Sequence, residues 1–211
     1  MDSKNAPAAG QYFMLQPDAR RGGAGHGVVF ENRKELLTPP RRILRPDAGG
    51  FPELAQTPRL VYSPKQGALP QDLEGGFSGY WLVSERLRNV MMAVDASAFE
   101  FVEADYRLAD GSVGERRFLC DFVRELDALD EEASTLEIER SDEFVGGKYY
   151  NLLGNIQLSF RKEVLGDAHV FRLPFSGLVF CDARFKSAVE RAGIIDGALS
   201  NGLWFEDLVN F

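Results

Sequence analysis

The densest cluster of chemically competent side chains lies at residues 124–134, which read RELDALDEEAS. Paired carboxylates can divide the roles of general acid and base, or they can hold a divalent cation together. One hypothesis is therefore a hydrolase or metal enzyme in which the fold brings a histidine, His26 or His169, to this cluster. Its five carboxylates are Glu125, Asp127, Asp130, Glu131 and Glu132.

The spacing of these residues argues against such chemistry. Asp127 and Asp130 share one face of a helix, but in an extended segment they point to opposite faces. The calcium-loop pattern with its central Gly is missing, as are the GxSxG nucleophile elbow and zinc-ligand spacing around either histidine. We therefore expect no catalytic residue, no metal site and no cofactor. The segment is interpreted as a solvated charge run or a helix start, or else as a surface that another protein binds.

The composition predicts a soluble globular protein without a disulfide. Of the 211 residues, 45% are apolar and 16 are Phe, which supplies ample core. The two cysteines, Cys120 and Cys181, lie in apolar stretches typical of buried free thiols. No apolar run reaches the roughly 20 residues needed to span a bilayer, and the N-terminus lacks a signal-peptide pattern. We expect a cytoplasmic protein.

The charge balance indicates the kind of partner. Acidic residues number 32 and basic residues 24, which gives a net charge of −8. Such a surface repels nucleic acid and anionic membranes, whereas it attracts a basic protein. No nucleic-acid or membrane partner is expected.

The hydrophobic pattern predicts an α+β fold with a mixed or antiparallel sheet and a few short helices. Strands are predicted at 11–15, 80–83, 99–108, 116–123, 149–160, 170–173 and 178–181, with a hairpin turn at Asp110-Gly111. We expect a flexible N-terminus at residues 1–10 and a single domain at 11–211. Within that domain, residues 38–70 hold seven of the ten prolines and are expected to be irregular.

Two helices have clear start signals. Ser84 is a good N-cap, Glu85 complements the helix dipole in the first turn, and Leu87 begins an apolar face. The second helix begins at Asp182, with Phe185 on its apolar face. These five residues are interpreted as structural before any other role is considered.

Four stretches, in this order and spacing, resemble the immunity protein 11 family (Imm11, earlier DUF1629). The resemblance spans residues 69–207. It is carried by LPQDL at 69–73, WLVSERL at 81–87, DALDEE at 127–132 with Ser134, and VFCD at 179–182, followed by Phe185-Lys186 and by GLWF at 202–205.

The resemblance implies a bacterial protein, encoded beside a secreted polymorphic toxin, that binds the toxin domain and blocks it. Such a role needs a complementary surface and no catalytic residues. The partner-binding candidates are Asp127, Asp130, Glu131 and Glu132. A binding module unrelated to toxins is the remaining alternative.

Overall fold

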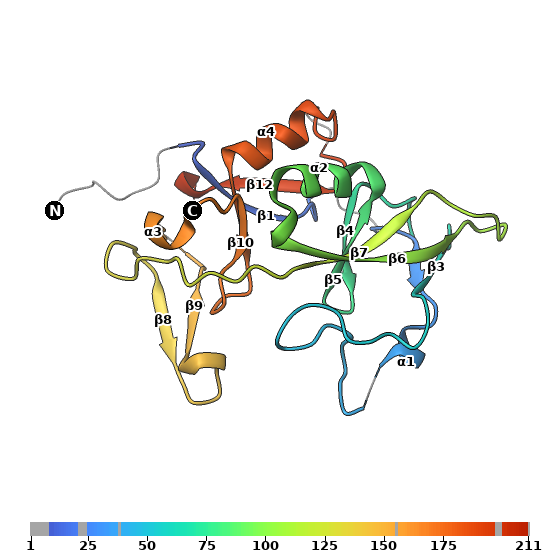
Figure 1. The fold of residues 1–211 in the computed structure, drawn as a ribbon, viewed down its shortest axis with the longest axis horizontal. Helices are drawn as coiled ribbons and strands as arrows, with labels where there is room; N and C mark the ends of the chain where they lie inside the picture. The colour runs from blue at the N-terminus through green and yellow to red at the C-terminus, as the bar shows by residue number, and fades with distance from the viewer. Residues whose placement is uncertain (1–8, 21–24, 38, 155, 197–199, 211) are drawn as a thin grey trace. The chain divides into compact units, whose positions relative to one another are not determined.

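The computed structural model describes residues 9–20, 25–37, 39–154, 156–196 and 200–210 (Figure 1). Backbone contacts divide the chain into two compact units. Unit 1 comprises the chain up to Gln16, Arg124–Ser187 and the chain from Phe205 onward, and unit 2 comprises Pro17–Val123 and Ala188–Trp204. Apart from residues 9 and 10, the N-terminus expected to be flexible lies outside the described residues.

Unit 2 is built on a six-stranded sheet in the order β2-β3-β6-β7-β5-β4. Neighbouring strands pair antiparallel except β3 and β6, which pair in parallel. This mixed pairing, together with the short helices, confirms the α+β class. The strands are β2 (Val28–Phe30), β3 (Arg59–Tyr62), β4 (Leu73–Phe77), β5 (Tyr80–Ser84), β6 (Phe99–Arg107) and β7 (Arg117–Phe122).

The centre of this sheet is the predicted hairpin of β6 and β7. Gly111 has a φ of 83°, which a turn requires and glycine adopts freely, and its N–H donates to Leu108 O at 2.9 Å. Every residue of β7 is buried, and the strand lies between β6 and β5 in the sheet. The register places Phe99 opposite Phe122.

Helix α2 (Glu85–Asp95) follows β5 directly and ends in the short helix η1 (Ala96–Ala98). The apolar spacing predicts the buried face correctly, since Leu87 and Met91 are 0% and 1% exposed. Helix α1 (Arg33–Leu36) is a single turn whose Leu36 enters the core of unit 2.

The proline-rich segment has little regular structure apart from β3. Its apolar residues join the core of unit 2: Leu60 is fully buried, and the ring of Phe51 stacks on Tyr80 with centroids 4.2 Å apart. Packing therefore orders this segment, as its apolar anchors predict.

Unit 1 contains a four-stranded sheet in the order β10-β11-β1-β12 and a separate two-stranded sheet of β8 and β9. The division between the units falls inside β1, α4 and β12. The strands are β1 (Tyr12–Pro17), β8 (Glu137–Arg140), β9 (Lys148–Asn151), β10 (Val170–Arg172), β11 (Val179–Asp182) and β12 (Leu203–Asp207). The helices are η2 (Val145–Gly147), α3 (Lys162–Leu165), α4 (Ala183–Arg191) and η3 (Leu208–Asn210).

The single strand predicted at 149–160 is wrong in its extent. β9 ends at Asn151, and the chain then makes only isolated bridges, at Gln157 and Phe160. Ile156, Leu158 and Phe160 are nevertheless buried, at 5%, 0% and 8% exposure. Their alternation reflects burial of one face without a continuous partner strand.

Both cysteines are free and buried, as expected. Burial raises the pKa of the Cys181 thiol. The longest described helix, α2, has 11 residues. None of the helices in the described ranges combines the length and the apolar character that crossing a membrane requires.

Candidate functional site

The acidic segment at 124–134 belongs to unit 1 and follows an extended path. Leu126 N–H donates to Arg172 O at 3.0 Å, and Asp130 N–H donates to Ser159 O at 2.9 Å. Leu129 lies between these bonds and is 2% exposed. These backbone hydrogen bonds and the buried leucine fix the conformation of the segment. The positions from which its acidic side chains extend are therefore fixed as well.

Two of the carboxylates are held by cations of unit 1. Glu131 is 2.5 Å from Lys148 Nζ and accepts the Tyr150 hydroxyl at 2.8 Å. Asp127 is 3.8 Å from Arg161 and 4.0 Å from Lys148. Arg140 lies 3.7 Å from Glu131, so these groups form one network of two acids, three cations and a phenol.

The network shifts the proton affinities of its members. The hydrogen bond from Lys148, assisted by Tyr150, lowers the pKa of Glu131. Burial lowers the pKa of Lys148, but its hydrogen bonds to Glu131 and Tyr150 outweigh this, so the net shift is upward. Burial is also the main cause that raises the pKa of Tyr150 to about 12. The network is therefore charged but internally compensated at neutral pH.

Asp130 and Glu132 have different surroundings. Asp130 Oδ1 accepts the backbone N–H groups of Glu132 and Ala133 at 3.2 and 3.0 Å, which closes a turn of the kind Asp favours. The turn does not continue into a helix. Glu132 is exposed, and its side chain has no hydrogen bond or ion pair among the residues that the structure describes.

Both histidines have polar contacts outside the acidic segment. His26 belongs to unit 2, where its Nε2 lies 3.2 Å from Gly75 O and its ring stacks on Phe77. His169 Nδ1 lies 2.7 Å from Asp182 Oδ2. Within the described ranges, no three His, Cys, Asp or Glu side chains come together as a metal site would require.

Asp182 also acts at the start of α4. Its Oδ1 accepts the N–H of Phe185 at 3.0 Å, which is the bond of an N-cap. Phe185 is fully buried. The helix cap explains why an Asp stands at position 182, and burial explains why a Phe stands at position 185.

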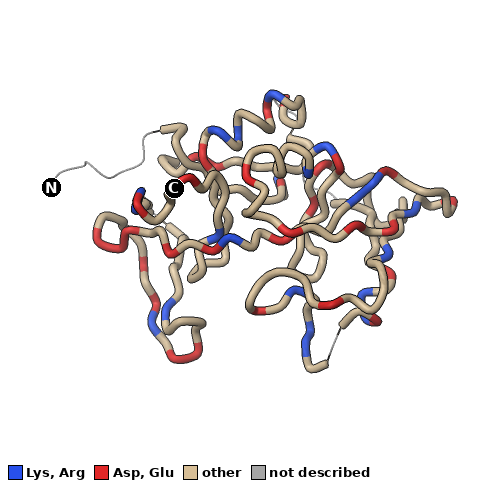
Figure 2. The backbone as a smooth tube through the Cα atoms, in the orientation of Figure 1, with Lys and Arg blue, Asp and Glu red and all other residues tan. Residues whose placement is uncertain are grey.

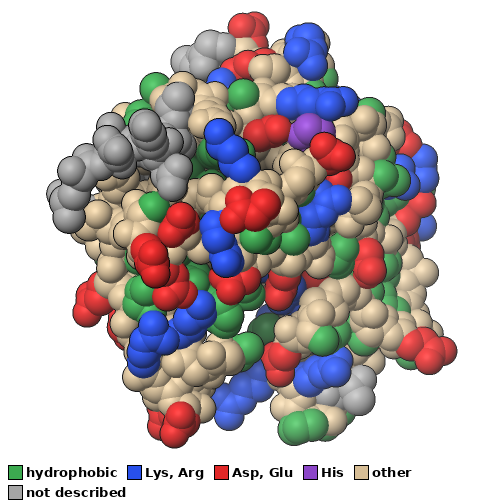
Figure 3. All heavy atoms as spheres, turned by 60° about the vertical axis from the view of Figure 1, so that its left-hand side comes forward, with side chains coloured by type: hydrophobic (Ala, Val, Ile, Leu, Met, Phe, Trp, Pro, Cys, Tyr) green, Lys and Arg blue, Asp and Glu red, His purple; other side chains and the backbone are tan. Residues whose placement is uncertain are grey.

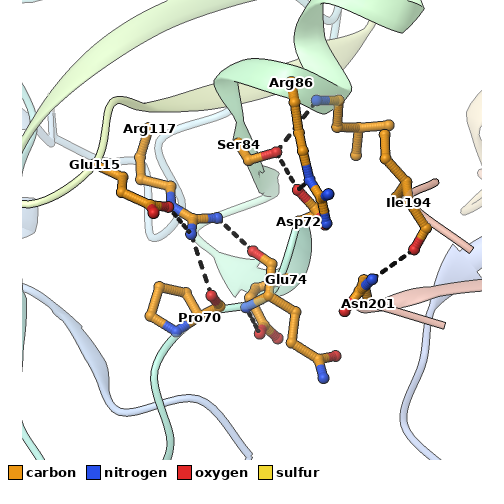
Figure 4. Close-up of polar contacts among 11 residues, drawn as sticks. Pro70, Asp72, Glu74, Ser84, Arg86, Glu115, Arg117, Ile194 and Asn201 are labelled. Carbon is orange, nitrogen blue, oxygen red and sulfur yellow. Dashed lines mark hydrogen bonds and ion pairs between the residues drawn. The ribbon is translucent and has the colours of Figure 1, made fainter. Parts of the chain in front are cut away.

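In unit 2, the stretches at 69–73 and 81–87 meet (Figure 4). The Ser84 hydroxyl donates to Asp72 Oδ1 at 2.5 Å and accepts the N–H of Leu87 at 3.2 Å, so that it caps α2. Arg86 donates to both carboxylate oxygens of Asp72, at 2.7 Å to Oδ1. The hydrogen bond to Asp72 raises the pKa of Arg86.

These side chains line an open hollow of about 630 Å³. Arg117, which is 5% exposed, donates to the backbone oxygens of Pro70 and Gln71, and burial lowers its pKa. Charges of both signs balance around the hollow, with three acidic and three basic residues in its lining. The lining consists of Pro70, Gln71, Asp72, Ser84, Glu85, Arg86, Glu115, Arg116, Arg117 and Asn201.

Sequence reasoning missed that the acidic run extends beyond the segment 124–134. Residues 125–143 hold nine Asp or Glu and a single Arg, a net charge of −8 that equals the charge of the whole chain. Figure 2 shows these red positions running from the loop before β8 to the turn after it. Counting charge in a sliding window, instead of by motif, would have found it.

The comparison with protein families identifies the chain. A search of the curated proteins finds no match. The model of a family described as "Immunity protein family (Imm11)" matches residues 11–210, nearly the whole length. The match includes the N-terminal third, which the resemblance at 69–207 leaves out, and it therefore takes in β1 to β3. The chain belongs to the immunity protein family (Imm11).

Proposed function

We propose that this protein binds the cognate toxin domain of a bacterial polymorphic toxin system and neutralises it without catalysis. Membership of the immunity protein family over residues 11–210 is the observation that carries the proposal. The toxin domain is the product of a neighbouring gene, and the encounter takes place in the cytoplasm of the producing cell.

The distribution of charge supports a basic partner. By sequence, unit 1 has 15 acidic and 9 basic residues, whereas unit 2 has 17 and 15. The net charge is therefore −6 in unit 1 and −2 in unit 2. An acidic surface concentrated in one unit steers a basic partner towards that unit and raises the association rate.

The four candidate carboxylates divide into two roles in this proposal. Asp127 and Glu131 are compensated by Lys148 and Arg161, and Asp130 closes its own turn. They hold the backbone in one conformation before the partner arrives, which lowers the entropic cost of binding. Glu132, which is exposed, offers its charge to the partner.

Co-expression with the neighbouring gene tests the proposal. The C-terminal domain of that gene's product is expressed in a bacterial host, alone or with this chain. We expect growth arrest by the domain alone, normal growth with this chain, and a complex that elutes as one species in size-exclusion chromatography. An immunity protein from an unrelated toxin system is the control.

Two outcomes would contradict the proposal. If growth is not restored and no complex forms, the protein is not the antagonist of that domain. If a complex forms but growth remains arrested, a binding module without a neutralising role is the better description.

A further inference from the structure

The turn between β8 and β9 in unit 1 exposes apolar side chains to solvent. Val145 is 83% exposed and Tyr149 is 41% exposed. Phe144, which is partly buried, contacts the ring of Tyr149 with centroids 5.7 Å apart. Apolar groups exposed together on a hairpin are typical of a surface that another molecule covers.

This turn is held in place by its own hydrogen bonds. Phe144 N–H donates to Ser141 O at 3.1 Å, and Gly147 N–H donates to Phe144 O at 2.9 Å. Gly146, with a φ of 69°, lies so close to Phe175 that a Cβ atom would be 2.6 Å from the ring. The exposure of Val145 therefore belongs to an ordered turn that packs against the rest of unit 1.

Acidic side chains lie close to the apolar ones in the sequence of the hairpin. Asp142 and Glu143 directly precede Phe144, Glu137 lies on β8, and all three are exposed, as is one basic residue of β8, Arg140. Figure 3 shows red acidic side chains on the face that it presents, interspersed with blue basic ones and with exposed green hydrophobic ones. A partner that covers this hairpin must present an apolar contact for Val145 within positively charged surroundings, because unpaired carboxylates would otherwise lose their hydration.

We propose that the hairpin of β8, η2 and β9 inserts into a basic cleft with an apolar floor on the toxin domain. This inference rests on the proposed function and adds the contact surface. A cleft with that charge is suited to a polyanionic substrate such as a nucleic acid, whose backbone phosphates the carboxylates of the hairpin would replace. The hairpin would inhibit the toxin domain by occupying the cleft that its substrate needs.

Binding kinetics with a purified, catalytically inactive form of the neighbouring gene's toxin domain test this assignment. The double variant Asp142→Lys and Glu143→Lys should slow association about tenfold at low salt, and the difference should shrink at high salt. Val145→Ser should speed dissociation about tenfold and leave association nearly unchanged.

Matched controls come from unit 2. Asp47→Lys with Glu53→Lys changes the charge by the same amount at two exposed positions, and Val113→Ser removes an apolar side chain that is 70% exposed. Thermal melts of all variants verify folding. The hairpin variants should differ from wild type and the controls should not.

The results separate this inference from the proposed function. If wild type binds and restores growth, but the hairpin variants bind as their controls do, the hairpin assignment is overturned and the proposed function stands. If wild type itself neither binds nor restores growth, both fail.

Discussion

Ser84 Oγ lies 2.5 Å from Oδ1 of Asp72, so the hydroxyl that caps α2 is itself held by a buried carboxylate. The two residues come from different stretches of the family pattern, LPQDL and WLVSERL. Their contact fixes the entry of α2 against the start of β4. It also gives a structural reason for both residue types, and the proposed toxin contact requires neither.

Replacing Ser84 by Ala should destabilise the protein by more than the loss of a helix cap alone. An N-cap is worth about 1 kcal/mol, and Ser84→Ala also removes a donor from Asp72, so we expect a loss of about 2 kcal/mol in the free energy of unfolding. Asp182→Ala likewise removes a cap together with a second contact, the one with His169, so its loss should also exceed about 1 kcal/mol. Urea denaturation measures both, and a loss of only about 1 kcal/mol at Ser84 would contradict the importance of the Asp72 contact.

Arg117 and its sequence neighbour Arg116 should differ in how much each stabilises the folded protein. Arg117→Leu leaves the carbonyl oxygens of Pro70 and Gln71 without a charged donor, which should cost about 2 kcal/mol. Arg116 is exposed and paired with Glu85 and Glu103, so Arg116→Leu should hardly change the urea midpoint. A larger effect at Arg116 would show that the buried guanidinium does not support the hollow.

The pH dependence of stability should reveal the Glu131 network. Because the folded-state pKa of Glu131 is lowered, the stabilisation is present above its unfolded value of 4.5 and is lost as the pH falls through the folded value. Glu131→Gln should therefore lower the melting temperature at pH 7 but not at a pH well below 4.5. Because the Glu131 side chain is partly exposed to solvent, the loss in the free energy of unfolding should be less than about 1 kcal/mol. Glu132→Gln serves as the control and should melt as wild type does at both pH values.

Reversing the charge of Glu132 should affect the encounter with the toxin domain. We expect Glu132→Lys to reduce the association rate several-fold at low salt, to leave dissociation unchanged, and to lose its effect at about 0.5 M salt. Stopped-flow measurements over a salt series test this. An association rate equal to that of wild type at low salt would exclude Glu132 from the encounter surface.

Local signals in the sequence predict the elements that depend on local interactions. The helix after Ser84 and the hairpin at Asp110-Gly111 follow from a cap, an apolar spacing and a turn dipeptide, each contained within a few residues. Strand β4 reads LEGGF, and its two glycines have a low strand propensity, so its sequence does not indicate a strand. Strand β8 reads EIER, too short and too polar to stand out as a strand.

The roles of the carboxylates could not be predicted in the same way. Whether Glu131 is free or compensated depends on Lys148, 17 residues away, and Arg161 is 34 residues from Asp127. Sequence spacing leaves both a helical and an extended path open for 124–134, and only the bridges to Arg172 and Phe160 distinguish them. Long-range pairing therefore sets what each carboxylate can do.

The position of β1 in the four-stranded sheet has a consequence during synthesis. This strand lies between β11 and β12, which follow it in the chain by more than 160 residues. At roughly 5 to 20 residues per second, β1 waits on the order of ten seconds or more for both neighbours. The four-stranded sheet therefore closes around β1 only after β12 has been translated, which makes its formation a late event in the folding of unit 1.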